Sequence, residues 1–248
     1  MKDKTVHLNL KPEGMDLISE TYLIDCMQGM KEYPDKYFDL AVVDPPYGID
    51  WMGQIQNPNT KANWKVYENK DWDKNKPSLE YWIELFRVSK NQIVWGGNYM
   101  TSHLPESPCW IIWDKMQEFS GATFEMAWTS FTSPAKAFRM SRVEAYANQT
   151  KIHPTQKPVK LYDWIYTTYA EPGQKILDTH LGSGSNRIAA HKNGLHFVGF
   201  EIDEEYYYAQ EHRFKTYLSQ PTLFSTPSAV GVLNSNAPTL NFEQSTEL

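Results

Sequence analysis

From residue 175 onward, strand and helix patterns alternate in a regular order. A buried-strand pattern starts at Lys175 and runs into a glycine-rich turn, and a helix is predicted near 186–193. A second strand follows at 196–202 and a second helix near 203–217. Strands that alternate with helices in this way predict parallel pairing, because each helix returns the chain to the same edge of the sheet.

The middle of the chain continues this alternation. Strand patterns fall at 37–44, 92–97, 109–114 and 124–131, and helical patterns fall near 77–90 and 156–170. With the last third they predict an α/β fold: a doubly wound, mostly parallel sheet covered by helices on both faces.

We predict a single domain over 1–218. The segment 51–77 is polar and long for a connection, and 133–157 is basic, so both are candidate recognition insertions. Residues 219–248 are rich in Ser, Thr, Asn and Pro, which predicts a disordered tail.

Charge is distributed unevenly along the chain. The net charge is −6, yet residues 133–160 carry six bases and one acid, whereas residues 201–248 carry seven acids and two bases. The basic run suits phosphate groups, and Lys136, Arg139 and Arg142 are its candidate phosphate contacts. A solvated surface run is the alternative interpretation of the same residues.

The cysteine count and the hydropathy exclude several classes of protein. Two cysteines, Cys26 and Cys109, are too few for a disulfide framework or a four-ligand zinc site, so we expect both to be reduced and no metal to bind. No apolar run approaches the roughly 18 residues that a membrane span needs, and the first residues lack a signal-peptide pattern. A cytoplasmic protein without a membrane partner is expected.

The turn DTHLGSGS at 178–185 indicates a nucleoside site. A strand-end acid, Asp178, precedes Gly182 and Gly184, and a helix begins just beyond them with free backbone N–H groups. Glu201 ends the next strand, nineteen residues after Gly182, where an acid accepts ribose hydroxyls. The turn lacks a triphosphate-binding pattern, so a cofactor without a phosphate chain fits. A tight turn without a ligand is the alternative.

A second motif, DPPY at 44–47, ends the first buried strand of the predicted sheet. Asp44 points toward the crevice where doubly wound sheets bind ligands, and Pro45 with Pro46 fixes the backbone so that a carbonyl faces outward. A carboxylate and a fixed carbonyl suit an amino group with two hydrogens, and Tyr47 adds a flat face beside them. A strand ended by prolines with a surface tyrosine is the simpler alternative.

Together the two motifs resemble those of DNA amino-methyltransferases that use S-adenosylmethionine, whose hallmarks are [DNS]PP[YFW] and DPFxGSGT. Their order, catalytic motif first, resembles the β class, a circular permutation of the others. Further matches are IDCMQGM at 24–30, IVWGGNY at 93–99, WDK at 113–115 and HPTQKPVKL at 153–161. The likeness extends over roughly 22–217.

The resemblance implies a Rossmann-like methyltransferase fold and a role for each matching residue. The catalytic residues would be Asp44, Pro45, Pro46 and Tyr47. The cofactor would be held by Asp178, Gly182, Ser183, Gly184 and Glu201, with Asp25 and Cys26 at the edge of its adenine and Lys157 nearby. The chain departs from the family at Thr179 and His180, which replace the usual Pro-Phe, and we expect His180 to be a packing substitute.

These features predict transfer of a methyl group from S-adenosylmethionine to the N6 amino group of adenine in double-stranded DNA at a short sequence. Methylation of cytosine N4 is the first alternative, because the chemistry is the same and Asp44 only inclines the resemblance toward adenine. A catalytically silent DNA-binding subunit is the second. A homodimer, a cognate restriction nuclease and a bacterial or phage origin fit the resemblance without being fixed by the sequence.

Overall fold

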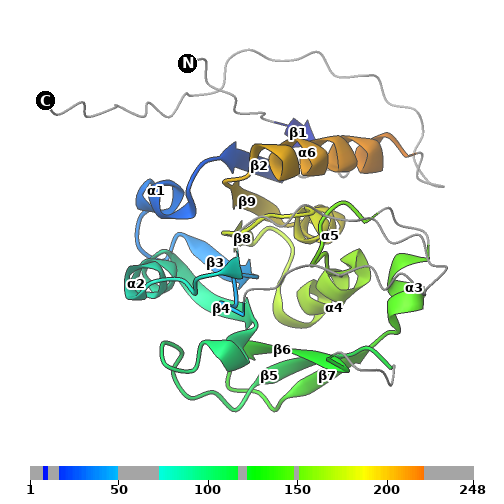
Figure 1. The fold of residues 1–248 in the computed structure, drawn as a ribbon. Helices are drawn as coiled ribbons and strands as arrows, with labels where there is room; N and C mark the ends of the chain where they lie inside the picture. The colour runs from blue at the N-terminus through cyan, green and yellow to red at the C-terminus, as the bar shows by residue number, and fades with distance from the viewer. Residues whose placement is uncertain (1–7, 11–16, 50–72, 117–121, 148–150, 221–248) are drawn as a thin grey trace, which may run out of the picture.

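A nine-stranded sheet runs through the part of the chain that the computed structural model describes, residues 8–10, 17–49, 73–116, 122–147 and 151–220 (Figure 1). The strands are β1 Leu8–Leu10, β2 Leu17–Leu23, β3 Phe38–Val43, β4 Ser89–Trp95, β5 Trp110–Asp114, β6 Phe124–Thr129, β7 Lys136–Arg139, β8 Lys175–Asp178 and β9 His196–Glu201. The helices are α1 Cys26–Lys31, α2 Leu79–Val88, the short 3-10 helix η2 Gly97–Tyr99, α3 Arg142–Tyr146, α4 Val159–Tyr169, α5 Ser185–Lys192 and α6 Glu204–Ser219.

The spatial order of the strands is β1-β2-β9-β8-β3-β4-β6-β5-β7. The five central strands, from β2 to β4, are parallel. Strand β1 is antiparallel to β2, β6 is antiparallel to both β4 and β5, and β7 is parallel to β5. The predicted α/β fold with a mostly parallel, doubly wound sheet is confirmed.

The winding direction reverses between β3 and β8. The chain leaves β3 through α2 and reaches β4 on one side, whereas it leaves β8 through α5 and reaches β9 on the other. Open α/β sheets bind ligands at the carboxyl ends of the strands where such a reversal occurs. This position in the fold therefore locates the site before any side chain is considered.

Alternate residues of β3 face opposite layers of helices. Leu40 and Val42 join a buried cluster with residues of α4 and α5, and Ala41 and Val43 join a second cluster with residues of α1 and α2. Figure 1 shows α1 and α2 on the left of the sheet and α3, α4 and α5 on the right. The predicted helical cover on both faces follows from this two-sided burial of the central strands.

Most predicted elements are present with small changes at their ends. Helix α4 begins at Val159 and not near 156, because Pro158 occupies its N-cap. Strands β1, β2 and β7, helices α1 and α3 and the 3-10 helix η2 were not predicted. Within the candidate insertion 133–157, residues 136–139 form the strand at one edge of the sheet.

Two predicted segments fall mainly beyond what is described. The candidate insertion 51–77 is described only from residue 73, and the predicted tail 219–248 only to residue 220. In the described ranges no helix is long and apolar enough to cross a membrane. The same ranges hold no cluster of three or more His, Cys, Asp or Glu side chains arranged for a metal ion.

Candidate active site

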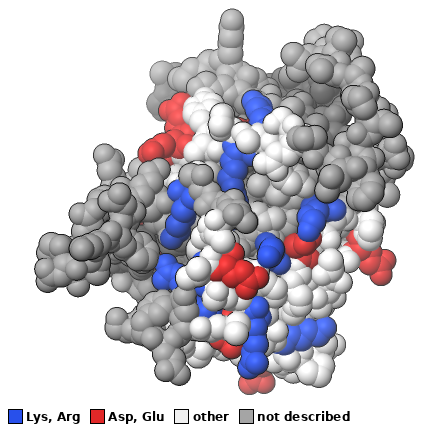
Figure 2. All heavy atoms as spheres, turned by 90° about the vertical axis from the view of Figure 1, so that its right-hand side faces the viewer, with Lys and Arg blue, Asp and Glu red and all other residues white. Residues whose placement is uncertain are grey.

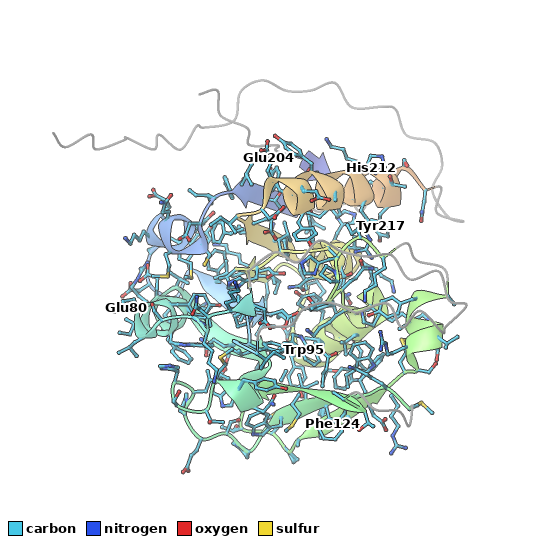
Figure 3. The ribbon with its side chains drawn as sticks, in the orientation of Figure 1. Glu80, Trp95, Phe124, Glu204, His212 and Tyr217 are labelled. Atoms are coloured by element: carbon cyan, nitrogen blue, oxygen red, sulfur yellow. The ribbon has the colours of Figure 1, made fainter. Side chains whose placement is uncertain are left out.

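Four carboxylates follow the carboxyl ends of four adjacent parallel strands. Asp25 follows β2, Glu201 ends β9, Asp178 ends β8 and Asp44 follows β3. The next strand, β4, ends at Trp95, which Figure 3 labels near the centre of the molecule. Asp44 and Asp178 begin the two sequence motifs and are 134 positions apart in the chain, yet they lie next to each other, on either side of the reversal in winding.

One amide side chain joins the two halves at this reversal. The ladder between β3 and β8 consists of only two residue pairs, ending at Ala41 and Leu177. Beyond it, Asn186 Nδ2 of α5 donates hydrogen bonds to the Val42 carbonyl (2.9 Å) and to Asp178 Oδ2 (2.9 Å). Asn186 thereby bridges the strand that carries Asp44 and the strand that carries the glycine turn.

The turn between β8 and α5 needs its glycines. Gly182 and Gly184 have φ angles of +50° and +68°, in the left-handed region that side chains disfavour. Glu201 holds the turn from the next strand: its Oε2 accepts a hydrogen bond from the Gly182 N–H (2.8 Å), and its Oε1 accepts from the N–H groups of Ile202 (3.1 Å) and Asp203 (3.0 Å). The carboxylate predicted for the ribose thus also fixes the turn.

Burial is the main cause of the pKa shifts of the two acids and the imidazole around the glycine turn. Burial raises the pKa of Asp178 to about 7, although Asn186 and the His180 N–H hydrogen-bond its carboxylate. Burial also raises the pKa of Glu201 and lowers that of His180 to about 4, so the imidazole is neutral near pH 7. His180 Nδ1 lies 2.9 Å from the Thr179 hydroxyl, which lies 2.7 Å from the Tyr81 hydroxyl.

The two residues predicted at the adenine edge lie at the start of α1. Asp25 is the N-cap, and its Oδ1 accepts a hydrogen bond from the Met27 N–H (2.8 Å). Burial raises the pKa of the adjacent Cys26 thiol to about 12, so the thiol stays protonated. Both cysteines are free, as predicted. Ser183, also predicted at the cofactor, lies in the turn with its hydroxyl 3.1 Å from that of Ser185.

The catalytic motif is held by partners that the sequence did not indicate. After β3, Pro45 is buried and Pro46 half-buried. The Tyr47 N–H donates to Asp73 Oδ1 (2.6 Å), and the Tyr47 ring stacks on Tyr99 with centroids 5.2 Å apart. A Cβ added to Gly96, whose φ is +67°, would lie 2.1 Å from the Tyr47 ring, so only glycine leaves room for that ring.

Both oxygens of Asp44 have close partners. The Tyr47 hydroxyl donates to Asp44 Oδ1 (2.7 Å), and Lys157 Nζ donates to Asp44 Oδ2 (2.5 Å). The sequence assigned no role to the Tyr47 hydroxyl, and this hydrogen bond corrects that view. Lys157, which the resemblance places near the cofactor, is ion-paired with the Asp44 carboxylate in the structure.

Lys157 links Asp44 to a second carboxylate. Its Nζ lies 3.3 Å from Glu125 Oε2 on β6, and Lys115 Nζ lies 2.8 Å from Glu125 Oε1. Burial alone would lower the pKa of Lys157, but Asp44 and Glu125 hold it above its ordinary value. Burial alone would likewise raise the pKa of Glu125, but Lys157 and Lys115 hold it below its ordinary value. Three ion pairs therefore join the two lysines and the two carboxylates.

The predicted DNA contacts lie on the far edge of the sheet. Lys136 and Arg139 are at the two ends of β7, and Arg142 begins α3. Arg139 Nε lies 3.3 Å from Asp114 Oδ2, and Lys136 lies over the Tyr169 ring at 5.4 Å. Figure 2, viewed from the right of Figure 1, shows Lys and Arg on this face with Asp and Glu among them. The surface is therefore less uniformly basic than the sequence run.

Comparisons with known proteins point to DNA methyltransferases. Residues 101–212, which include the glycine turn, match the family described as DNA methylase. Type II methyltransferase M2.DpnII of Streptococcus pneumoniae is 26% identical over 192 residues, 74% of this chain and 66% of that protein. M.HinfI of Haemophilus influenzae is 24% identical over an alignment of 265 positions, which covers 86% of this chain and 72% of that protein. The chain thus spans just under two thirds of the first relative.

Solved structures show the same fold. The M1.HpyAVI complex with SAM has a TM-score of 0.52 at 16% identity and covers 78% of this chain and 97% of that chain. The cytosine-N4-specific PvuII DNA methyltransferase has a TM-score of 0.53 at 13% identity. The match covers 84% of this chain and 88% of that chain. The likeness to these structures shows the fold, which is Rossmann-like. In sequence the chain is similar to S-adenosylmethionine-dependent DNA amino-methyltransferases, with the family match in residues 101–212.

The residues at the carboxyl edge fit S-adenosylmethionine. A Cβ added to Gly182 would be in ordinary van der Waals contact with the His153 ring, at 3.7 Å, so this ring borders the glycine turn on that side. Glu201 has three N–H donors at 2.8 to 3.1 Å, fewer than the roughly four lone-pair sites of a carboxylate. An acceptor position therefore remains for a hydroxyl.

Proposed function

We propose that this protein methylates the N6 amino group of adenine in double-stranded DNA at a short recognition sequence. The observation that supports it most directly is the position of Asp44, which lies next to the cofactor turn across the reversal in winding. When bound, S-adenosylmethionine supplies an electrophilic methyl group on a sulfonium. The residues at the carboxyl edge of the sheet would bind the reactants, orient them and stabilise the charge that develops.

Asp44 would act on the amino group of the target base. That nitrogen is a poor nucleophile because its lone pair is delocalised into the ring. Hydrogen bonds from the amino group to the Asp44 carboxylate and the Pro45 carbonyl would favour a tetrahedral nitrogen with a localised lone pair. The carboxylate would also stabilise the positive charge that develops on that nitrogen. Tyr47 would stack on a base that has left the duplex.

The residues around the glycine turn would bind and orient the cofactor. Asp178, Gly182, Ser183, Gly184 and Glu201 are proposed to hold the cofactor, with Asp25 and Cys26 at the edge of its adenine. Since the Cys26 thiol is protonated, it can contribute packing and a weak donor, but not a nucleophile.

We also propose how the chain is organised around this reaction. Residues 1–218 would form one catalytic domain, with 51–77 and 133–157 as the DNA-recognition insertions. The protein would work in the cytoplasm, where its DNA substrate is, and a homodimer and a cognate restriction nuclease are the proposed partners.

Expression in a bacterium that lacks DNA methylation, followed by methylation-aware sequencing, tests the function. N6-methyladenine at one short sequence is expected with the wild-type protein. Methylation of cytosine N4 at such a sequence would overturn the adenine assignment. Cofactor binding without any methylation would favour the DNA-binding subunit.

The variant Asp44→Ala separates chemistry from binding. Removing one preorganised polar group typically lowers the rate about a hundred- to thousandfold. We expect a loss of that size in single-turnover methyl transfer, while calorimetry gives a dissociation constant for S-adenosylmethionine close to the wild-type value. A variant that methylates near the wild-type rate would contradict the proposed mechanism.

A further inference from the structure

The pairing of Lys157 with the catalytic carboxylate raises a difficulty for the proposed reaction. Asp44 Oδ2 already holds the Lys157 ammonium at 2.5 Å, and Oδ1 holds the Tyr47 hydroxyl at 2.7 Å. A target amino group would have to share this carboxylate with a cation. Since the amino nitrogen becomes positive as the methyl group is transferred, an ammonium on the same carboxylate opposes that charge.

The buried position of Lys157 limits where its charge can go. The side chain is 2% exposed, so the ammonium cannot turn toward water and needs a carboxylate partner at all times. Glu125 Oε2, at 3.3 Å, is a second acceptor within reach. A small movement of Nζ from Asp44 toward Glu125 would keep the charge paired and would free Asp44.

The surroundings of Lys157 favour both positions of the ammonium. Its Nζ lies 5.1 Å from the centre of the Trp95 ring and 5.8 Å from that of the Tyr47 ring, so aromatic faces stabilise the cation along the path. Lys115 holds the other oxygen of Glu125 at 2.8 Å and keeps this carboxylate in place. Glu125 is fixed and ready to accept the cation before the base arrives.

We propose that Glu125 is a positioning residue that draws the Lys157 ammonium away from Asp44 when the target amino group binds. The inference rests on the proposed function. Lys157 keeps its three protons throughout, and no covalent bond forms or breaks in this step. Lys157 would then protect the empty site, by neutralising a half-buried carboxylate, and Glu125 would release that carboxylate for the reaction.

The variant Glu125→Gln tests this directly, because it removes the second carboxylate with little change in size. Lys157 would stay on Asp44, so single-turnover transfer from tritiated S-adenosylmethionine to polymerase-amplified, unmethylated genomic DNA should slow at least tenfold. The dissociation constant for S-adenosylmethionine should stay within about twofold. The matched control is Glu84→Gln, which removes a carboxylate paired with Arg87 on α2 and should leave the rate unchanged.

A second substitution separates positioning from a merely structural role. In the double variant Glu125→Gln with Lys157→Met, no cation remains to occupy Asp44, so the rate should rise above that of Glu125→Gln alone. Lys115→Met gives an independent check, because Glu125 would lose the ion pair that keeps it in place and would draw Lys157 away from Asp44 less well. That variant should be slower than wild type, but less so than Glu125→Gln.

Several results would overturn the inference. They are a wild-type rate for Glu125→Gln, a double variant no faster than Glu125→Gln, or a wild-type rate for Lys115→Met. Urea denaturation of each variant identifies failures to fold, and if Glu125→Gln does not fold, the Lys115→Met result decides. If the wild-type protein transfers no methyl group to this DNA, the proposed function fails, and the inference fails with it.

Discussion

At the scale of single residues, the hydroxyl of Tyr47 distinguishes the structure from the motif. It donates to Asp44 Oδ1 at 2.7 Å, so phenylalanine would keep the stacking face and lose a hydrogen bond to a charged group. Such bonds are worth about 1.5–3 kcal/mol. We expect Tyr47→Phe to bind DNA normally and to slow methyl transfer about tenfold or more.

Single-turnover kinetics at saturating DNA measure this effect. Tyr208→Phe, at an exposed position of α6, is the matched control and should retain the wild-type rate. If Tyr47→Phe methylates as fast as this control, the hydroxyl has no part in holding Asp44 for the reaction.

Glu201 is the second residue whose role the structure extends. Glu201→Ala removes the proposed ribose acceptor and also the acceptor of the Gly182 N–H. We expect calorimetry to show S-adenosylmethionine binding weakened at least tenfold, since a hydrogen bond to a charged acceptor contributes about 1.5–3 kcal/mol. Glu205→Ala, in the first turn of α6, is the control. Equal affinity for both variants would mean that the ribose is held elsewhere.

At the scale of elements, the turn after β8 contains two groups that change the stability of the fold with pH in opposite directions. Asp178, with its pKa raised to about 7, keeps a proton in the folded state that the unfolded chain has released. Its contribution to stability is therefore lost as pH rises from about 4 to 7. His180, with its pKa lowered to about 4, contributes stability that is lost as pH falls from about 6.5 to 4.

Urea denaturation at a series of pH values separates the two groups. Relative to wild type, Asp178→Asn should become more stable as pH rises from 4 to 7, because only the wild-type protein loses the Asp178 contribution. His180→Phe should become more stable relative to wild type as pH falls from 6.5 to 4. Variant and wild-type curves that run parallel over these ranges would contradict the pKa directions.

The elements also show what the sequence could predict. Residues 40–43 of β3 are apolar without interruption, so burial of this strand on both faces can be predicted from the local sequence. Strand β2 was missed because its buried Ser19 and Thr21 are polar. Ser19 accepts a hydrogen bond from Arg187 of α5 (3.0 Å), and Thr21 donates one to Glu211 of α6 (2.5 Å). These partners are far away in the chain, so no local pattern indicates the strand.

The same reason explains what was missed at the site. The motifs located Asp44, Asp178 and Glu201, because a short local pattern carries each of them. The partners of Asp44 come from distant segments: the pairing of Lys157 with Asp44 and with Glu125 was not predicted. Charge pairs between distant segments depend on the strand order, which only the folded structure provides.

At the scale of the whole molecule, the basic edge formed by β7 and α3 has a measurable role if DNA lies along it. Neutralising one phosphate contact lowers the log–log salt slope of binding by about 0.9. The double variant Arg139→Ala with Arg142→Ala should lower the slope by up to about 1.8 if both contact phosphates. Because Arg139 already has Asp114 at 3.3 Å, its share should be the smaller one.

Fluorescence anisotropy over a range of salt concentrations gives these slopes. Lys192→Ala, at the end of α5 far from the glycine turn, is the control and should leave the slope unchanged. Equal slopes for the double variant and wild type would show that this edge is a solvated surface, and the segment 51–77 would then be the remaining candidate.

The strand order also constrains how a cell can make this protein. Strand β3 leaves the ribosome early, but its neighbour β8 follows more than 130 residues later, and β2 waits still longer for β9. The centre of the sheet therefore closes only when nearly all of the domain has been synthesised, and such long-range pairing is slow. The nascent chain cannot assemble the edge that carries Asp44, Asp178 and Glu201, so it stays inert toward the chromosome until translation of the domain is almost finished.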